Sequence, residues 1–219
     1  MLENLDIIKV FFRGNISRVS YLFKNNLYMK SQLHNHILKL VPGFEKEIEK
    51  VLCYFEEQTF PKNHVVIDEG DSVDRFYFVI KGCLHIYFKD HDGHQNTIHF
   101  AIEDWWVTEY NAFLGANLSS FGIATLEDTE VLMITNKNFE QLLFDYPFMG
   151  IYFNKIHMRA YGASLQKQKT YPMTSKKDFY TYFCKTYPDL VKRFPDDVLA
   201  SYIGISTDEL RVFNESFRS

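Results

Sequence analysis

The sequence predicts an α+β fold in three parts: an N-terminal antiparallel β-roll of the jelly-roll (double-stranded β-helix) type, a long helix, and a C-terminal helix-turn-helix domain. Three observations support this prediction. Short apolar segments separated by turn signals fill residues 57–133. Apolar residues then recur at helical spacing after residue 147. Near the C-terminus, small and apolar residues follow the spacing of a helix-turn-helix.

Residues 1–30 form an extension whose composition differs from the rest of the chain. The segment is rich in asparagine and aromatic residues and has no clear periodicity. Two interpretations stay open: either Met29 is the natural start and the preceding residues are upstream sequence, or the segment is a genuine N-terminal arm. Helical spacing begins at about Gln32 and is interrupted at Pro42-Gly43.

The β-roll is expected over residues 31–145. Asp92-Gly93 is the strongest hairpin signal, because this dipeptide favours a tight turn between two strands. Further turn signals stand at regular intervals along the segment, and several short strands at such spacing favour a small barrel or jelly roll. These further signals are Glu69-Gly70-Asp71, Lys81-Gly82 and Glu127-Asp128.

The long helix is expected over residues 146–171. Pro147 suits the first turn of a helix, and Tyr171-Pro172 is expected to end it. The apolar stripe on this helix would be partly exposed in an isolated subunit, which predicts a dimerisation helix and a homodimer. The predicted interface residues are Met149, Phe153, Ile156 and Ala160.

Residues 172–219 contain the helix-turn-helix spacing. Ala200 is followed four residues later by Gly204, and Leu210 comes six residues after that. The small side chain of Ala200 lets two helices approach, Gly204 suits the tight turn, and Ser206 can cap the second helix. This pattern predicts DNA as a partner.

Charge is distributed unevenly along the 219 residues, whose net charge is −4. Residues 61–145 hold five Lys and Arg against fourteen Asp and Glu, and residues 146–194 hold nine against two. The last 25 residues hold two against five. DNA-binding domains usually present a basic face, but here the basic block precedes the helix-turn-helix. That block is either a solvated helix surface or a source of contacts to the DNA backbone.

The cysteines and the hydropathy predict a cytoplasmic protein without a membrane partner. Cys53, Cys83 and Cys184 are scattered and form no disulfide framework, which favours a reducing compartment. No apolar run is long enough to cross a membrane. Lys9 interrupts the N-terminal apolar run, and no signal-peptide cleavage site follows it.

The order of β-roll, long helix and helix-turn-helix resembles the Crp/Fnr family of bacterial transcription regulators. The segments that carry the resemblance are VVIDEGD, FYFVIKGCLHIYF, WWVTEYNAF and ASYIGISTDEL, and together they span roughly residues 31–219. The pair Trp105-Trp106 and the compact C-terminal domain look most similar to the branch common in Bacteroidetes. The resemblance implies a cyclic-nucleotide-binding-like roll, a dimerisation helix and a DNA-binding domain.

The resemblance also implies a ligand pocket. In relatives that bind cyclic nucleotides, a Glu accepts a hydrogen bond from the ribose, and an Arg followed by Ser or Thr neutralises the phosphate. The corresponding positions here are Glu109 and Ser119-Ser120. No Lys or Arg occurs from Asp90 to Asn136, whereas eight carboxylates do, and a buried phosphate needs a cation or several N–H donors. We therefore predict no cyclic-nucleotide binding of the usual kind. The nearby aromatic residues either line an apolar pocket or belong to the core. The predicted pocket residues are Trp105, Trp106, Glu109, Phe113, Ser119, Ser120 and Phe121.

The recognition helix departs from the family's pattern. Its early contact positions fall on Thr207 and Asp208, and the later Arg position falls on Val212, with Arg211 about 100° round the helix. Direct readout of guanine uses Arg or Lys, and phosphate neutralisation uses several of them. DNA binding should therefore be weak or atypical. The predicted DNA-binding residues are Ser206, Thr207, Asp208, Arg211 and Arg218.

The sequence predicts no enzyme, no cofactor and no metal site. His34 and His36 form an HxH pair, but residues two apart on a helix point in different directions. Two functions stay open. One is a dimeric Crp/Fnr-like transcription regulator whose effector is an unknown small molecule other than a nucleotide, or is absent. The other is a Crp/Fnr-derived sensor or protein-interaction module that has lost sequence-specific DNA binding. The charge of the recognition helix favours the second, and the family resemblance favours the first, which we adopt.

Overall fold

The computed structural model describes residues 28–115 and 117–218, with the backbone alone for residues 216–218. A helix over residues 28–40 opens the described chain and is followed by α2 (Glu45–Val51) and a 3-10 turn (Leu52–Tyr54). The expected interruption lies between the two helices, where Gly43 has a φ of 96°. Met29, Leu33 and Ile37 are buried on one face of the first helix. The expected boundary at residue 30 therefore falls inside an element that belongs to the core, and the rest of the extension lies outside the described residues.

Two four-stranded antiparallel sheets form the roll, as the sequence predicted, and the α+β fold class is confirmed. One sheet has the order β1-β8-β3-β6 and the other β2-β7-β4-β5, so β5 is an edge strand. The Asp92-Gly93 turn joins β4 to β5, with Gly93 at a φ of 82°. The first sheet comprises β1 (Glu56–Phe60), β8 (Thr129–Thr135), β3 (Arg75–Lys81) and β6 (Trp106–Val107), and the second comprises β2 (Val65–Ile67), β7 (Gly122–Thr125), β4 (Leu84–Lys89) and β5 (Gln95–Ala101).

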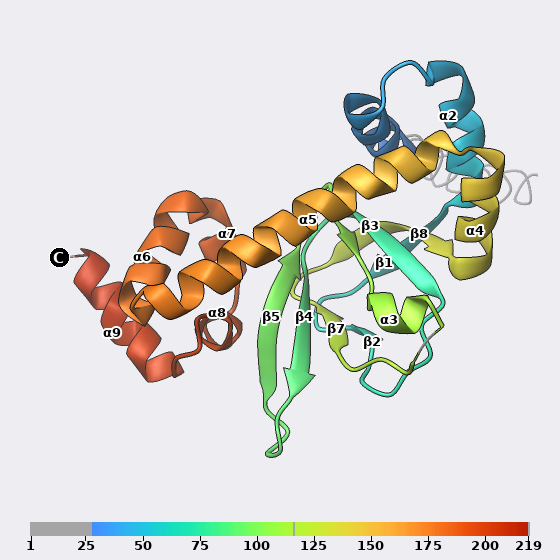
Figure 1. Cartoon of the computed structure of the whole chain (residues 1–219). Helices are drawn as coiled ribbons and strands as arrows, with labels where there is room; N and C mark the ends of the chain where they lie inside the picture. The colour runs from blue at the N-terminus through green and yellow to red at the C-terminus, as the bar shows by residue number, and fades with distance from the viewer. Residues whose placement is uncertain (1–27, 116, 219) are drawn as a thin grey trace, which may run out of the picture.

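Helix α3 (Tyr110–Phe113) follows β6, α4 (Asn136–Asp145) follows β8, and α5 (Phe148–Met173) comes directly after α4. Figure 1 shows α5 running along the roll and continuing to the C-terminal helices. The sequence placed the start of α5 correctly, although Pro172 lies inside the helix rather than beyond it. Residues 157–166 are all exposed and belong to neither buried core, so the middle of α5 bridges the roll and the C-terminal helices.

One face of the first half of α5 is buried in the chain's own core, and this corrects the predicted dimer interface. Met149 and Phe153 are 0% and 3% exposed and pack against the roll. Ile156 is partly buried against the same core, and Ala160 lies just beyond the roll and is exposed. The apolar stripe was real, but it covers the roll. Met149 and Phe153 are therefore not available to a second copy.

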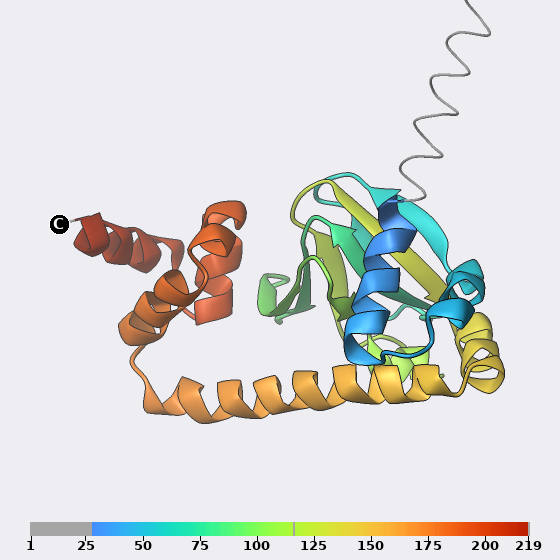
Figure 2. The same cartoon turned by 90° about the horizontal axis from the view of Figure 1, so that it is seen from above.

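The C-terminal helices are α6 (Lys176–Thr186), α7 (Pro188–Arg193), α8 (Asp196–Ile203) and α9 (Thr207–Arg218). They surround a second, smaller core, and Figure 2 shows them at the end of α5 remote from α4. This core also includes Cys83, Phe100 and Leu126 from the roll, so the helix-turn-helix domain is packed on the roll. Within the described part of the chain, none of the helices has the length and apolar character needed to cross a membrane.

Candidate functional site

Glu109 is the residue expected to bind a ribose, but its carboxylate is hydrogen-bonded to backbone N–H groups of the residues that follow it. It is the N-cap of α3, and its carboxylate accepts hydrogen bonds from Asn111 N at 3.3 Å and Ala112 N at 2.8 Å. The side chain is 6% exposed. N–H groups at a helix start are the donors that an anionic ligand could use without a basic side chain. Here a carboxylate of the protein takes those donors, and its negative charge opposes a phosphate at the same place.

The other predicted pocket residues do not gather into one site. Trp106 is buried among core aromatics and donates from Nε1 to Tyr152 Oη at 2.9 Å. Phe113 packs beside Phe76 in the same core. For these two aromatics the core interpretation is therefore correct. Trp105 points elsewhere: it is 45% exposed and stacks on His99, with ring centroids 5.7 Å apart.

Ser119, of the Ser119-Ser120 pair, forms hydrogen bonds with backbone groups of neighbouring loops. Ser119 is buried, its hydroxyl donates to Phe121 O at 2.7 Å, and its backbone N–H donates to Asp71 O at 2.8 Å. Ser120 is exposed, and Phe121 is half-buried. Ser119 thus closes the chain against the turn at residues 70–71 and does not present its hydroxyl to a ligand.

The helix-turn-helix geometry matches its sequence signal closely. Gly204 ends α8 with a φ of 77°, and its N–H donates to Ala200 O at 2.9 Å. Tyr171, from the end of α5, donates to Ile203 O at 3.1 Å. A Cβ at Gly204 would lie 2.4 Å from Tyr171 Oη. The turn therefore requires glycine both for its left-handed backbone and for the close approach of Tyr171.

Charged side chains on the outer face of α9 are paired within the helix and its cap. Ser206 Oγ accepts from Glu209 N at 3.2 Å, and Glu209 Oε2 accepts from Ser206 N at 2.8 Å, which together form a capping box. Ser206 donates to Glu209 Oε2 from its backbone N–H and also from its hydroxyl, at 2.9 Å, and these two hydrogen bonds lower the pKa of Glu209. Asp208 pairs with Arg211 at 2.9 Å, and both side chains are largely exposed.

Of the predicted DNA-binding residues, Ser206 thus caps the helix and Arg211 is paired to a carboxylate. Thr207 begins α9, and Arg218 ends it with a side chain outside the described residues.

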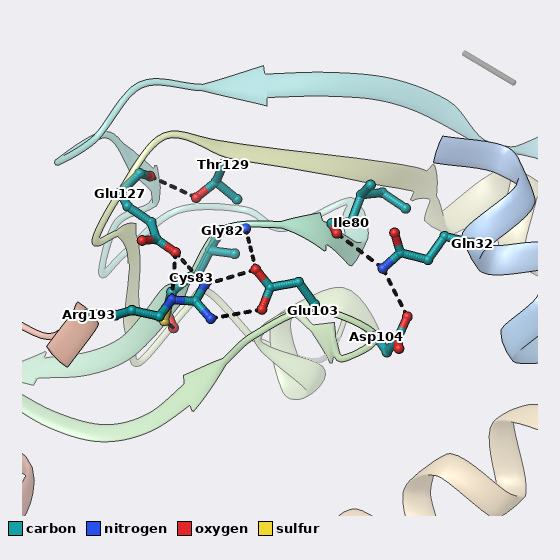
Figure 3. Close-up of polar contacts among 10 residues, drawn as sticks. Gln32, Ile80, Gly82, Cys83, Glu103, Asp104, Glu127, Thr129 and Arg193 are labelled. Atoms are coloured by element: carbon teal, nitrogen blue, oxygen red, sulfur yellow. Dashed lines mark hydrogen bonds and ion pairs between the residues drawn. The ribbon is translucent and has the colours of Figure 1, made fainter. Parts of the chain in front are cut away.

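A charged contact that the sequence reasoning missed joins the roll to the helix-turn-helix domain (Figure 3). Arg193, at the end of α7, donates from Nη1 and Nη2 to the two carboxylate oxygens of Glu103 at 3.0 and 2.9 Å. Its Nε also donates to Glu127 Oε1 at 3.1 Å. Arg193 belongs to the basic block of residues 146–194, and here it contacts carboxylates of the roll. The sequence signal that could have found this pairing is the acidic roll segment followed by a basic segment.

Comparisons with known proteins agree with this architecture. Residues 57–146 match the family model described as cyclic nucleotide-binding domain. The cAMP-activated global transcriptional regulator CRP of Pasteurella multocida is 24% identical over 106 residues, which cover 48% of this chain and 51% of that protein. The CRP of Salmonella typhimurium is 22% identical over 102 residues, which cover 47% and 49%. The chain spans about half the length of the curated relatives it matches.

Solved structures share the fold over a longer stretch. CLP of Xanthomonas campestris, described as a c-di-GMP responsive global regulator, has a TM-score of 0.62 at 19% identity and covers 79% of this chain and 91% of its own. A mutant of CooA from Carboxydothermus hydrogenoformans has a TM-score of 0.61 at 14% identity, with coverages of 77% and 78%. These structures share the fold of this chain, and its membership of the Crp/Fnr family stays a prediction. Membership of the Bacteroidetes branch stays a prediction.

Proposed function

We propose that this chain is a dimeric, DNA-binding transcription regulator of the Crp/Fnr type whose sensor roll does not hold a cyclic nucleotide in the usual way. The observation that carries the proposal is the geometry of α8, Gly204 and α9, placed after a cyclic-nucleotide-binding-like roll and a long helix. Gly204 has a left-handed backbone, and a Cβ at this position would lie only 2.4 Å from Tyr171 Oη. The turn between the two helices therefore requires glycine. That requirement is met in the position and order that a helix-turn-helix regulator needs.

The exposed face of α5 supports dimerisation and replaces the interface first expected. Ile151, Met158 and Leu165 are 53%, 66% and 46% exposed and recur every seven residues. They lie on the side of the helix opposite Met149 and Phe153, since residues seven apart return to nearly the same face. Tyr161, also largely exposed, widens this stripe. A seven-residue apolar repeat on a solvent-facing helix suits pairing with the same helix of a second copy.

The residues of the roll favour an effector other than a cyclic nucleotide, or the absence of an effector. The carboxylate of Glu109 occupies the amides at the start of α3, and the segment from Asp90 to Asn136 contains no basic residue. Within this segment, the exposed Trp105 stacks on His99 and offers an aromatic surface. An uncharged or cationic aromatic molecule would suit such a surface better than a phosphate ester.

DNA contact by this chain rests on phosphates more than on bases. The outer face of α9 carries Asp208, Glu209 and Glu215 against Arg211, which is paired to Asp208. Carboxylates repel the DNA backbone, so affinity should be modest and strongly dependent on salt. In a dimer, two such helices should address half-sites about one helical turn, roughly 34 Å, apart.

Fluorescence anisotropy with random-sequence and selected duplexes between 50 and 200 mM salt tests this function. Glu215→Lys should tighten binding and steepen the salt slope by about 1–2 units per dimer, because it replaces repulsion by a phosphate contact. Glu140→Lys makes the same charge change on exposed α4, at the end of α5 remote from α9, and should have a much smaller effect. Nanomolar, sequence-specific binding by the unmodified chain at 200 mM salt would contradict the weak-binding part of the proposal.

A second candidate function is a protein-interaction module that no longer reads DNA. The net negative outer face of α9, with Val212 exposed at its centre, favours this candidate. Undetectable DNA binding at 50 mM salt by both the unmodified chain and Glu215→Lys would select it over the regulator.

A further inference from the structure

Helix α8 covers the free edge of β5. Ser201 Oγ accepts from Thr97 N at 2.8 Å and donates to Gln95 O at 3.1 Å. These are backbone groups of an edge strand that would otherwise face water or another strand. The first helix of the helix-turn-helix pair therefore satisfies two backbone groups on this edge of the roll.

Aromatic side chains continue this contact beside the edge strand. Phe100 of β5 stacks on Phe194, the residue after α7, with ring centroids 4.0 Å apart and planes 14° apart. Tyr202 of α8 lies 4.8 Å from the same Phe100 ring. Lys167 of α5 donates to Ile98 O at 2.8 Å and lies 4.0 Å above the Tyr202 ring. A charged contact joins the two domains beside this aromatic one.

Arg193 supplies that charge. Its side chain is 27% exposed, and those of Glu103 and Glu127 are 36% and 33% exposed. The bidentate pairing to Glu103 is the geometry in which a guanidinium binds a carboxylate most strongly. Two carboxylates share one cation, so loss of Arg193 would leave two like charges side by side. Both carboxylates belong to the roll, so without Arg193 the docked domain would cover them without a cation, which costs free energy.

The roll end of this contact lies on a segment connected to several other parts of the molecule. Glu103 also accepts from Gly82 N at 2.9 Å, and the next residue, Asp104, accepts from Gln32 at 3.0 Å (Figure 3). Trp105 and Trp106 follow directly, the latter bonded to Tyr152 of α5. A displacement of residues 104–106 would thus be transmitted to Glu103. The exposed middle of α5 offers no packing that would fix the helix-turn-helix domain in its place.

We propose that Arg193, Glu103 and Glu127 form an interdomain latch that holds the helix-turn-helix domain against β5, and that opening the latch releases the domain from the roll. The chemistry is competition for one guanidinium between the carboxylates of the roll and solvent or another anion. A role of the latch in regulating DNA binding rests on the function proposed above. The conformational role, holding and releasing the domain, is independent of that function.

Hydrogen exchange of the full-length chain, followed by mass spectrometry, tests the latch without DNA. Arg193→Ala and the nearly isosteric Glu103→Gln/Glu127→Gln pair should speed exchange of peptides covering residues 95–101 about tenfold or more, because Thr97 N–H loses its acceptor on α8. Peptides covering β3 and β8 should exchange as in the unmodified chain, which separates release from unfolding. Lys192→Ala is the matched control: it removes a neighbouring charge that pairs with Asp189 on its own helix. Exchange at residues 95–101 equal to that of Lys192→Ala would overturn the latch.

Anisotropy with the Glu103→Gln/Glu127→Gln variant then tests regulation, since this variant alters no residue of the helix-turn-helix domain. A DNA affinity changed at least threefold is expected. Faster exchange with an unchanged affinity would overturn the regulatory role. Undetectable DNA binding by every variant would contradict the proposed function and leave the exchange result in place as evidence for the latch.

Discussion

At the scale of single residues, Glu109 shows how a carboxylate of the protein can take the backbone donors at the start of a helix. Glu109 directs both oxygens at the backbone amides that begin α3. A phosphate would have to displace a buried carboxylate and bind without a basic residue from the segment 90–136. Both requirements cost free energy.

We therefore predict that cyclic AMP and cyclic GMP do not bind tightly. Isothermal titration calorimetry at millimolar nucleotide should show no saturable heat. A dissociation constant below about 10 μM, equivalent to about −7 kcal/mol, would show that donors other than basic side chains complete the site.

His85 makes a second prediction at this scale, on the pH dependence of stability. It is 3% exposed, its Nδ1 lies 3.0 Å from Thr97 Oγ1, and burial lowers its pKa to about 4, against a smaller opposing effect of Asp197. The unfolded chain binds a proton near pH 6.5, so between about pH 6.5 and 4 it holds more protons than the folded chain. Stability should therefore fall as pH decreases through that window, by on the order of 2–3 kcal/mol.

Urea denaturation at a series of pH values measures this effect. His85→Gln removes this titrating group, keeps a hydrogen-bonding side chain beside Thr97, and should lessen the dependence between pH 6.5 and 4. Part of the dependence should remain, because burial also lowers the pKa of His99 to about 4. His91→Gln removes an exposed imidazole in the β4–β5 turn and should leave the dependence as it was. An unchanged slope in His85→Gln would mean that another group is responsible.

At the scale of elements, a glycine in α5 and a glycine in the α8–α9 turn differ in whether the structure needs them. Gly204 has a left-handed backbone, and a Cβ there would meet Tyr171 Oη at 2.4 Å. Gly162 lies inside α5, and a Cβ there would meet nothing within 4 Å. One glycine is needed by the fold, and the other lowers helix propensity without a packing reason in the single chain.

Alanine substitutions should therefore differ in sign. Gly204→Ala should lower the free energy of unfolding by about 1–3 kcal/mol, through left-handed strain and the contact with Tyr171. Gly162→Ala should raise it by up to about 1 kcal/mol. Denaturant titration of both variants at the same protein concentration gives the comparison, and destabilisation of equal size by both substitutions would refute this account of the turn.

At the scale of the whole molecule, α5 has two apolar faces with different partners. One face covers the roll, and the other presents Ile151, Met158 and Leu165 to solvent. The same helix leads to the helix-turn-helix domain (Figure 1). Pairing of the exposed faces would therefore bring two recognition helices into one particle, which is what a two-fold DNA site requires.

Sedimentation at micromolar concentration should show a dimer that Met158→Asp converts to a monomer without loss of fold. Phe144→Asp is the matched control, because Phe144 is 81% exposed but lies on α4, away from the stripe. A monomer in the unmodified chain, or a dimer untouched by Met158→Asp, would rule out this interface.

The sequence by itself determined the features that depend on neighbouring residues. Asp92-Gly93 places a hairpin because its backbone preference is local, and the spacing of Ala200, Gly204 and Leu210 places a helix-turn-helix because the close approach and the turn both lie within a few residues. The helical period of α5 was equally readable.

Only the tertiary structure decided which partner each face and charge meets. Periodicity reveals an apolar face but not what covers it, so Met149 and Phe153 pack on the roll and not on a second copy. Composition reveals acidic and basic segments but not their pairing, so Arg193 meets Glu103 and Glu127 across a separation of 90 and 66 residues. These contacts are made between residues distant in the chain, and their energies depend on burial and geometry that exist only after the roll and the helix-turn-helix domain have packed together.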